Sequence, residues 1–271
     1  MTSPALQEIV ALLGCPAAGD PSQYLFERAI EAAGLDWRFV TCDVAATDAA
    51  AALAGVAALA FRGCLVSGAI REAALQHVAT ASPSATFAGA VNLIERRERT
   101  LVGHMTEGRG IVEALRAHVD PAERVAIVAG AGPCGRAVAL ELAAAGVGEL
   151  LIGDPDTTRA ASLVESLPAG TPATVIDWRP ITVPLRAGIL VLTPGDGPLQ
   201  AVGLRPDLVV ADAVAAGSRS PLAAEAVAHG SCLVDAIEIH AVEAAIDFQT
   251  LSGVEADVDM LREALEEFFA A

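Results

Sequence analysis

The chain has 271 residues, and 54% of them are hydrophobic, which allows one large domain or two of ordinary size with buried cores. Its 34 acidic residues outnumber its 17 basic ones, and the formal net charge is -17 at pH 7. This charge argues against nucleic-acid-binding proteins and proteins that bind anionic membranes, because both need a concentrated basic surface. All 17 basic residues are arginines, and the sequence contains no lysine.

The cysteines form no Cys-x-x-Cys pair, so the sequence predicts neither a disulfide framework nor a zinc site. We expect a cytoplasmic protein without a bound metal. Residues 1–20 lack the basic start of a signal peptide, and no apolar run approaches the ~18 uninterrupted residues of a membrane-spanning helix. The cysteines are Cys15, Cys42, Cys64, Cys134 and Cys232.

Apolar runs and alanine-rich stretches alternate in the first part of the chain, which predicts a separate layer of helices and strands. The basic stretch from Arg96 to Arg99 is interrupted by Glu98, and we interpret it as a solvated turn rather than a phosphate site. The predicted elements are residues 5–13, 26–33, 37–43, 56–61 and 64–66, and the alanine run of residues 45–60 is interpreted as a helix.

From Val125 onward, short β-branched runs alternate with alanine-rich helical stretches, as in a parallel α/β sheet. The Asp120-Pro121 step predicts a domain boundary, because proline disfavours helix in the residue before it. Two amphipathic helices with acidic faces follow the sheet. The predicted strands are residues 125–129, 149–152, 173–176, 189–192, 208–211 and 232–234, and the predicted helices are residues 134–145, 242–250 and 258–269.

A Gly-Ala-Gly-Pro-Cys-Gly segment at residues 130–135 directly follows a predicted strand and opens a predicted helix. Glycines at this spacing let the backbone approach a pyrophosphate, which the helix N-terminus then holds. The cysteine is either a reactive thiol at that terminus or a small side chain in a crowded loop. The predicted cofactor-binding residues here are Gly130, Gly132, Pro133, Cys134 and Gly135.

The next predicted strand ends in Asp154, with Asp156 close behind it. An acid at this distance from the glycine loop takes the adenosine ribose hydroxyls of a dinucleotide. Two carboxylates would also repel the 2′-phosphate of NADP, so we expect NAD to be preferred over NADP. The alternative is that Arg159 pairs with that phosphate, although its place a turn into the next helix is typical of a surface residue.

Several further segments occur in an order and spacing typical of one enzyme family. They are GLDWRF at 34–39, GAVN at 89–92, GHMTEG at 103–108, the glycine loop, DPDTTRA at 154–160 and GVEAD at 253–257. With them, the chain resembles the shikimate/quinate dehydrogenase family from about Gly14 to the C-terminus. We expect an α/β fold with an αβα substrate-binding domain (residues 1–107 plus 238–271), a doubly wound Rossmann dinucleotide-binding domain (residues 108–237) and an active site in the cleft between them.

In that family, a segment Asn-Val-Thr-x-Pro-Phe-Lys carries a substrate-binding Asn and Thr and the catalytic Lys. Here it is LVSGAIR at residues 65–71, so the Thr is kept as Ser67 and the Lys is replaced by Arg71. The family's Asn-Thr-Asp is Met105-Thr106-Glu107, with a longer carboxylate. The resemblance therefore implies that Arg71 and Glu107 occupy the catalytic positions.

The family's paired serines, which hold the substrate carboxylate, correspond to Asp20 and Ser22, and an anionic Asp20 would repel a carboxylate. Asn92 is kept. The Gln of the C-terminal helix is Glu243, which is either a second acid of the site or part of an acidic helix face. The expected substrate-binding residues are Asp20, Ser22, Ser67, Asn92 and Glu243.

A further family segment lies near the nicotinamide. The family's Asn-Ala-Thr-Pro loop retains only Thr193 and Pro194 here, with Val191 in the Asn position. A tyrosine that contacts the substrate in the family is replaced by Ala215. The resemblance implies that Thr193 contacts the cofactor.

Oxidising an alcohol by hydride transfer also requires removal of the hydroxyl proton. Arg71 stays protonated, with a pKa above ~12, so it cannot be the base, but it can orient Glu107 and stabilise an alkoxide. Glu107 is then the candidate base, and His104 is a second candidate. Alternatively, Arg71 and Glu107 form a structural ion pair and His104 is structural.

Two functions therefore remain open. The first is an NAD-dependent dehydrogenase acting on a polyol, cyclitol or shikimate-like alcohol, with an altered substrate. The second is a non-catalytic dinucleotide-binding or sensing relative, because the lysine is missing. The enzyme is favoured because Arg71 and Glu107 have the same charge signs as the family residues they replace, and because the glycine loop is intact. Its expected partner is a small-molecule substrate, without nucleic acid or membrane, and a homodimer is compatible with the sequence.

Overall fold

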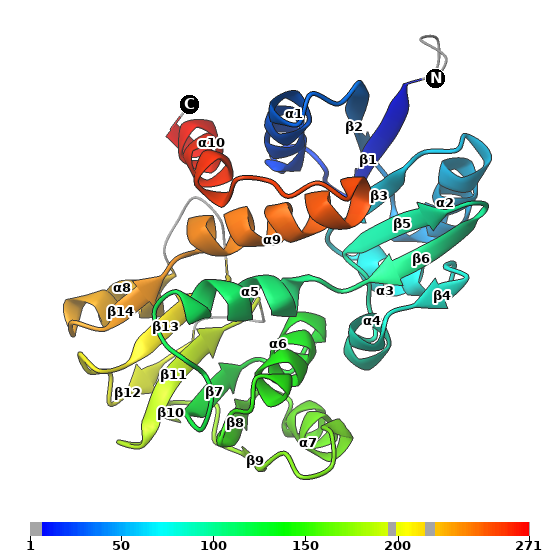
Figure 1. Cartoon of the computed structure of the whole chain (residues 1–271). Helices are drawn as coiled ribbons and strands as arrows, with labels where there is room; N and C mark the ends of the chain where they lie inside the picture. Colours follow the sequence, from blue (N-terminus) through cyan, green and yellow to red (C-terminus); the bar gives the residue numbers. More distant parts are fainter. Residues whose placement is uncertain (1–6, 195–198, 215–219, 271) are drawn as a thin grey trace. The chain divides into compact units, whose positions relative to one another are not determined.

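The computed structural model describes residues 7–194, 199–214 and 220–270, and the chain packs as two compact units (Figure 1). Unit 1 comprises Met1–Thr106 and Glu243–Ala271, and unit 2 comprises Glu107–Val242. The sequence predicts domain boundaries after residue 107 and before residue 238. By packing, Glu107 belongs to unit 2, and the chain returns to unit 1 at Glu243, within helix α9 (Ala236–Ser252).

Unit 1 contains a six-stranded mixed sheet in the order β2-β1-β3-β5-β6-β4. Strand β1 pairs in parallel with β2 and β3, and β5 pairs antiparallel with β3 and β6. The apolar run of β1 is buried from Val10 to Gly14, as expected for a central strand covered on both faces. The strands are β1 Glu8–Gly14, β2 Trp37–Asp43, β3 Gly63–Val66, β4 Thr80–Ala81, β5 Leu93–Arg97 and β6 Thr100–His104.

The basic stretch of residues 96–99 lies in the β5–β6 hairpin, which the sequence does not predict. Arg97 and Arg99 are exposed, and Glu98 adopts a positive φ of 55° in the turn. Arg96 is half-buried and donates from Nε to the Phe61 carbonyl at 2.6 Å. The interpretation as a solvated turn is thus right for the tip of the hairpin and wrong for Arg96.

An aromatic cluster packs the C-terminal segment of unit 1 against the N-terminal segment of the same unit. The Phe26 ring of α1 lies 5.1 Å from Phe39 of β2 and 5.8 Å from Phe248 of α9, and such pairs stabilise beyond their buried area. Helix α1 also packs against α10. The helices are α1 Ser22–Ala32, α2 Ala49–Ala58, α3 Ile70–Leu75, α4 Pro83–Ala88, α9 Ala236–Ser252 and α10 Val258–Ala270, with a short 3-10 helix at Ala46–Asp48.

Unit 2 contains a six-stranded parallel sheet in the order β14-β13-β11-β7-β8-β9. A separate parallel pair, β10 and β12, lies beside it. The strands are β7 Val125–Ala129, β8 Glu149–Gly153, β9 Ala173–Val175, β10 Ile181–Thr182, β11 Ala187–Leu192, β12 Ala201–Val202, β13 Val209–Asp212 and β14 Cys232–Val234. The helices are α5 Glu107–Arg116, α6 Pro133–Ala144, α7 Thr157–Ser166 and α8 Pro221–Ala228.

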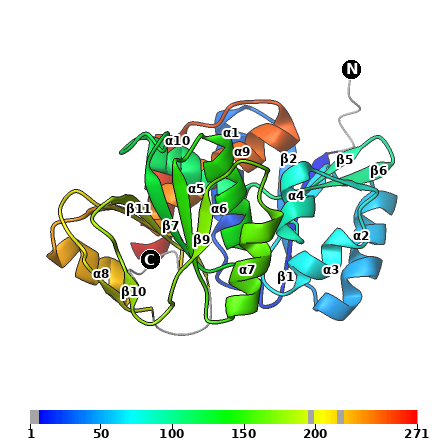
Figure 2. The same cartoon turned by 90° about the horizontal axis from the view of Figure 1, so that it is seen from below.

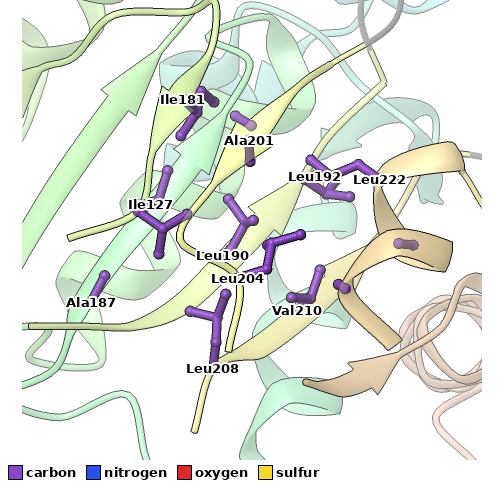
Figure 3. Close-up of a cluster of buried hydrophobic side chains, with 14 of the residues drawn as sticks. Ile127, Ile181, Ala187, Leu190, Leu192, Ala201, Leu204, Leu208, Val210 and Leu222 are labelled. Carbon is purple, nitrogen blue, oxygen red and sulfur yellow. The ribbon is translucent and has the colours of Figure 1, made fainter. Parts of the chain in front are cut away.

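This sheet is covered on both faces, as the predicted doubly wound fold requires. In chain order its strands are arranged 3-2-1-4-5-6, which is the Rossmann order. Figure 2 shows α6 and α8 on opposite sides of β7 and β11. On the α8 side, Ile127 joins a buried apolar cluster in which Leu192 lies beside Leu222 (Figure 3). The predicted fold class is confirmed.

No helix in the described part of the chain is both long enough and apolar enough to cross a membrane.

Helices α5 and α6 approach each other closely through Gly108. A Cβ atom at this position would meet the backbone of Ala137 and would lie 2.8 Å from the Val138 nitrogen. These are main-chain atoms inside a helix, so they cannot move aside as a flexible side chain would. Only glycine permits this spacing of the two helices.

We expect Gly108→Ala to lower the free energy of unfolding by about 2 kcal/mol, because an added methyl would force the two helices apart. Thermal or urea denaturation measures the change. Gly55→Ala is the matched control, since Gly55 lies in α2 and a Cβ there would meet nothing within 4 Å. The control should be stabilised by about 0.5–1 kcal/mol. Equal effects of the two substitutions would contradict this account of the packing.

Candidate active site

The glycine loop connects β7 to α6 and leaves room for a ligand at one glycine. Gly130 has a φ of 114°, and a Cβ there would meet the Thr193 hydroxyl. A Cβ at Gly135 would meet the Gly130 carbonyl. At Gly132, which precedes the first turn of α6, a Cβ would have nothing within 4 Å. Two glycines therefore permit tight packing, and the third faces open space where a pyrophosphate would lie.

The helix that follows begins with Pro133 at its first position, where a missing amide costs little. Cys134 is 7% exposed, which fits the interpretation as a small side chain in a crowded loop. An anion could therefore approach the backbone amides at the N-terminus of α6.

Thr193 lies beside this loop. It follows β11, the neighbour of β7, and its hydroxyl donates to the Ala129 carbonyl at 2.8 Å. The strand order reverses between β7 and β11, and ligands of doubly wound sheets bind outside the carboxyl ends of the strands at such a switch point. The glycine loop and Thr193 therefore meet where a dinucleotide is expected.

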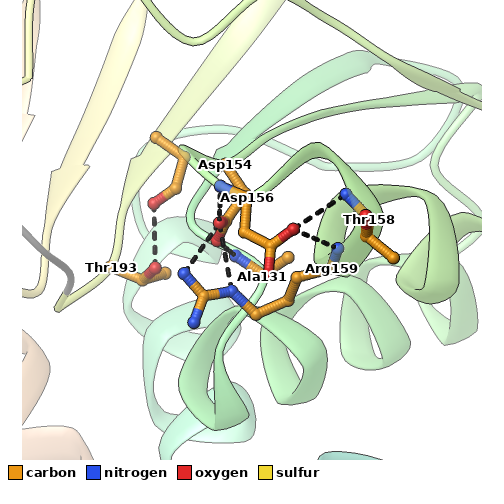
Figure 4. Close-up of polar contacts among 7 residues, drawn as sticks. Ala131, Asp154, Asp156, Thr158, Arg159 and Thr193 are labelled. Atoms are coloured by element: carbon orange, nitrogen blue, oxygen red, sulfur yellow. Dashed lines mark hydrogen bonds and ion pairs between the residues drawn. The ribbon is translucent and has the colours of Figure 1, made fainter.

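The carboxylate of Asp154 is 3% exposed, and both of its oxygens accept hydrogen bonds within the protein (Figure 4). Oδ2 accepts from the Ala131 amide at 2.7 Å, and Oδ1 accepts from the Asp156 amide at 2.8 Å. Arg159 donates to Oδ1 from Nη2 at 2.8 Å and from Nε at 3.0 Å. This carboxylate thus joins the glycine loop to the β8–α7 loop, and a guanidinium offsets its charge.

Asp156 caps helix α7. Its Oδ1 accepts from the amides of Thr158 at 2.9 Å and Arg159 at 3.2 Å. Such a cap typically stabilises a helix by about 1 kcal/mol. The cap fixes the first turn of α7, and the Arg159 side chain, which is 41% exposed, extends from that turn beside Asp154.

In unit 1, Asn92 lies at the centre of a buried polar network. Its Nδ2 donates to Thr106 Oγ1 at 2.7 Å and to Glu243 Oε1 at 2.9 Å, and its Oδ1 accepts from the Thr106 amide at 2.7 Å. The Thr106 hydroxyl in turn donates to Asp247 Oδ1 at 2.6 Å. Asn92 therefore uses both amide hydrogens and its carbonyl within the protein.

Asp247 is a member of this network that the sequence interpretation misses. It is 1% exposed and lies one helical turn after Glu243 on α9, so both acids lie on the same helix face. That spacing of two carboxylates on one face is the signal that could have identified it. It also favours Glu243 as an acid of the site over a member of an exposed acidic face.

The other predicted substrate residues of unit 1 lie near the ends of β1 and β3. Asp20 accepts from the Ser22 amide at 2.9 Å and from its hydroxyl at 2.5 Å, just before α1. A Cβ at Gly14 would meet the Ser67 hydroxyl, so Ser67 lies over the end of β1. Half-buried Arg71 donates from Nε to the Val66 carbonyl at 3.3 Å.

Glu107 begins α5, is 8% exposed and directly follows Thr106 of the polar network. His104 faces a different group, because its Nε2 lies 3.4 Å from Glu95 Oε2. Burial lowers the pKa of His104, and the nearby Glu95 carboxylate partly offsets that effect. The contact with Glu95 supports the structural interpretation of His104. Ala215 lies outside the described residues.

A family model described as the shikimate dehydrogenase substrate binding domain matches residues 12–94. The shikimate dehydrogenase (NADP(+)) of Halobacterium salinarum is 33% identical over 267 residues, which cover 95% of this chain and 98% of that protein. The chain belongs to the shikimate/quinate dehydrogenase family. The shikimate dehydrogenase (NADP(+)) of Moorella thermoacetica is 40% identical over 170 residues, 62% of this chain and 58% of that protein.

A solved structure extends the comparison within the dehydrogenases. The ligand-free 5-ketofructose reductase of a Gluconobacter species has a TM-score of 0.85 and 28% identity, and the match covers 97% of this chain and 99% of that one. The family of dehydrogenases predicted from the sequence is therefore confirmed.

The expected preference for NAD over NADP is wrong. The two shikimate dehydrogenases compared above are both named as NADP(+) enzymes. The prediction assumed that Asp154 and Asp156 would present two charges to the 2′-phosphate. Instead, Asp154 is buried and paired with Arg159, and Asp156 caps a helix. The like-charge repulsion that motivated the prediction is therefore largely offset inside the protein.

We expect Thr106→Val to lower the free energy of unfolding by about 1–3 kcal/mol, because valine removes a hydroxyl that donates to buried Asp247 and accepts from buried Asn92. Thermal denaturation measures the loss. Thr106→Ser keeps the hydroxyl and should retain most of the stability. A valine variant as stable as the wild type would show that this network does not stabilise unit 1.

Proposed function

We propose that the protein is an NADP-dependent dehydrogenase that interconverts an uncharged polyhydroxylated alcohol and its ketone, rather than acting on shikimate. The observation that carries this proposal is the acidic character of two predicted substrate residues, Asp20 and Glu243, and of Asp247 in the polar network. Asp20, Glu243 and Asp247 all belong to unit 1, and Asp20 occupies a family position that holds the substrate carboxylate. An anionic substrate would meet like charge there.

The hydrogen bonds of Asn92 support the same substrate class. Both of its amide hydrogens are already donated, one of them to Glu243. A substrate carboxylate would have to compete with Glu243 for that amide. A substrate hydroxyl can instead donate to the Glu243 carboxylate, so a neutral polyol suits this arrangement better. A related reductase is named for a keto sugar, which is consistent with such a substrate.

The cofactor proposal rests on the glycine loop and Arg159. The open space at Gly132 and the N-terminus of α6 suit a pyrophosphate, and the partly exposed guanidinium of Arg159 suits a 2′-phosphate. When bound, the nicotinamide supplies or accepts the hydride. Asp154 holds Arg159 in place by two charge-assisted hydrogen bonds, so the phosphate contact would be preorganised.

Glu107 is the proposed proton acceptor for the substrate hydroxyl. Its neighbour Thr106 is held at both its amide and its hydroxyl, which fixes the start of α5. Arg71 cannot take the proton, because a guanidinium stays charged, but its charge would stabilise an alkoxide. The alternative of a cofactor-binding protein without catalysis is favoured only by the missing lysine.

The proposal is tested first by fluorescence titration with NADPH and with NADH, followed by reduction assays on neutral polyhydroxy ketones and on 3-dehydroshikimate. We expect NADPH to bind and the neutral ketones to be reduced. NADPH binding without turnover of any ketone would support the non-catalytic alternative. Faster reduction of the carboxylate-bearing ketone would overturn the proposed substrate class.

Arg159→Leu should weaken NADPH binding at least about tenfold, because it removes the cation proposed to meet the 2′-phosphate. NADH binding should change much less. The control is Arg186→Leu, which removes an exposed arginine paired with Glu149 elsewhere in unit 2. An equal loss of affinity for both cofactors in Arg159→Leu would contradict the assigned role.

Glu107→Gln should lower kcat by about 100-fold or more, the usual contribution of a general base, while the Kd for NADPH stays within about twofold. Steady-state kinetics and the titration give the two values. Glu113→Gln on the same helix is the matched control, because Glu113 is only partly buried and is paired with Arg116. Retention of full kcat in Glu107→Gln would exclude Glu107 as the proton acceptor.

A further inference from the structure

Three chemically active side chains meet in unit 2 away from the glycine loop. The exposed thiol of Cys232 lies with Sγ 3.6 Å from Nδ1 of His118, and Nε2 of the same imidazole lies 2.8 Å from Oε1 of Glu238. Cys232 begins β14 and pairs with Val209, the first residue of β13. The cluster therefore lies at the amino ends of the parallel strands, whereas the glycine loop follows the carboxyl end of β7.

The geometry defines how His118 can act. The Glu238 carboxylate accepts the hydrogen of Nε2, which leaves Nδ1 as the acceptor that faces the thiol. A nucleophile next to a base that is oriented by a third group is the arrangement that activates thiols and hydroxyls in proteins. Glu238 is itself positioned, because its amide donates to Asp235 Oδ1 at 3.0 Å in the first turn of α9.

The arrangement does not fit a metal site. His118 lies between the other two side chains and uses a different ring nitrogen for each, so the three do not converge on one point. Within the described ranges, no group of three or more His, Cys, Asp or Glu residues could hold a metal ion.

The other cysteines lack this combination of exposure and activation. Cys64 is buried, and burial raises the pKa of its thiol to about 12, with a smaller contribution from Cys42. Cys134 is also buried. Cys15 is exposed like Cys232, but no histidine of the described segments hydrogen-bonds to it. Cys15 is therefore the natural internal comparison.

We propose that Cys232 is a modification site at which a small hydroperoxide oxidises the thiol, with His118 as base and Glu238 as the group that orients it. The sulfur attacks one peroxide oxygen, an S–O bond forms and the O–O bond breaks. The thiol proton passes to His118 Nδ1 and then to the departing oxygen, which leaves as water or an alcohol. Sulfur loses two electrons to become a sulfenic acid, and the peroxide gains them.

The test treats the full-length protein with hydrogen peroxide in the presence of dimedone, which traps sulfenic acids, and follows each cysteine peptide by mass spectrometry. We expect Cys232 to be trapped at least about tenfold faster than Cys15 in the same sample. His118→Asn should reduce the Cys232 rate to that of Cys15, and Glu238→Gln should reduce it partly. The rate at Cys15 should not change in either variant.

The buried thiols show whether the variants remain folded. If Cys64 and Cys134 stay unmodified, a loss of Cys232 trapping in His118→Asn reports on the imidazole and not on unfolding. A Cys232 rate equal to that of Cys15 in the wild type would overturn the proposal. So would a fast Cys232 rate that persists in both His118→Asn and Glu238→Gln.

Discussion

The buried carboxylate of Asp154 connects the parts of unit 2 on which cofactor binding depends. A charge that is 3% exposed needs strong partners, and Asp154 has amides from two loops and a guanidinium. The glycine loop, the end of β8 and the first turn of α7 are therefore fixed relative to one another. If the carboxylate were removed, Arg159 would lose the contact that positions it, and the glycine loop would lose a hydrogen bond.

Unit 1 also contains a buried carboxylate that needs hydrogen-bond partners. Asp247 is 1% exposed, and the Thr106 hydroxyl that satisfies it also accepts from Asn92. One threonine thus joins a carboxylate on α9 to an amide next to β5. Such a network is strong only while every member is satisfied, because a buried polar group left without a partner costs more than a typical hydrogen bond contributes. In the proposed function, the same few atoms contribute to both substrate specificity and stability.

Much of the fold could be predicted from the sequence, because the strands of unit 2 are continuous apolar runs between glycines and helices. Strands β7 and β14 begin and end where the pattern indicates. The β5–β6 hairpin was missed because its arginines are typical of an exposed turn, although β5 is partly buried. Helix α5 was not predicted either, since glycines at its second and fourth positions weaken the local helical pattern and only the packing against α6 explains Gly108.

The site was predicted less completely, for a physical reason. Sequence spacing identified the glycine loop and Asp154, and the family resemblance identified Asn92, but neither reveals which group neutralises a buried charge. Asp154 was expected to take the ribose hydroxyls and to repel a 2′-phosphate, whereas its carboxylate is buried and paired with Arg159. Asp247 escaped notice because an acid among the apolar residues of α9 has no local signal other than its spacing from Glu243.

In the proposed reaction, arginine at the position that the resemblance assigns to the catalytic lysine separates two tasks that a lysine could perform alone. A lysine can both carry a positive charge and release a proton, because its pKa shifts readily when it is buried. A guanidinium keeps its charge, so in the proposed reaction Arg71 stabilises the alkoxide at any pH at which the protein is folded. The proton must then go to a carboxylate, and the longer side chain of Glu107 extends the reach of that carboxylate by one methylene. In the proposed reaction, arginine at position 71 therefore requires a different residue as proton acceptor, and Glu107 is the proposed one.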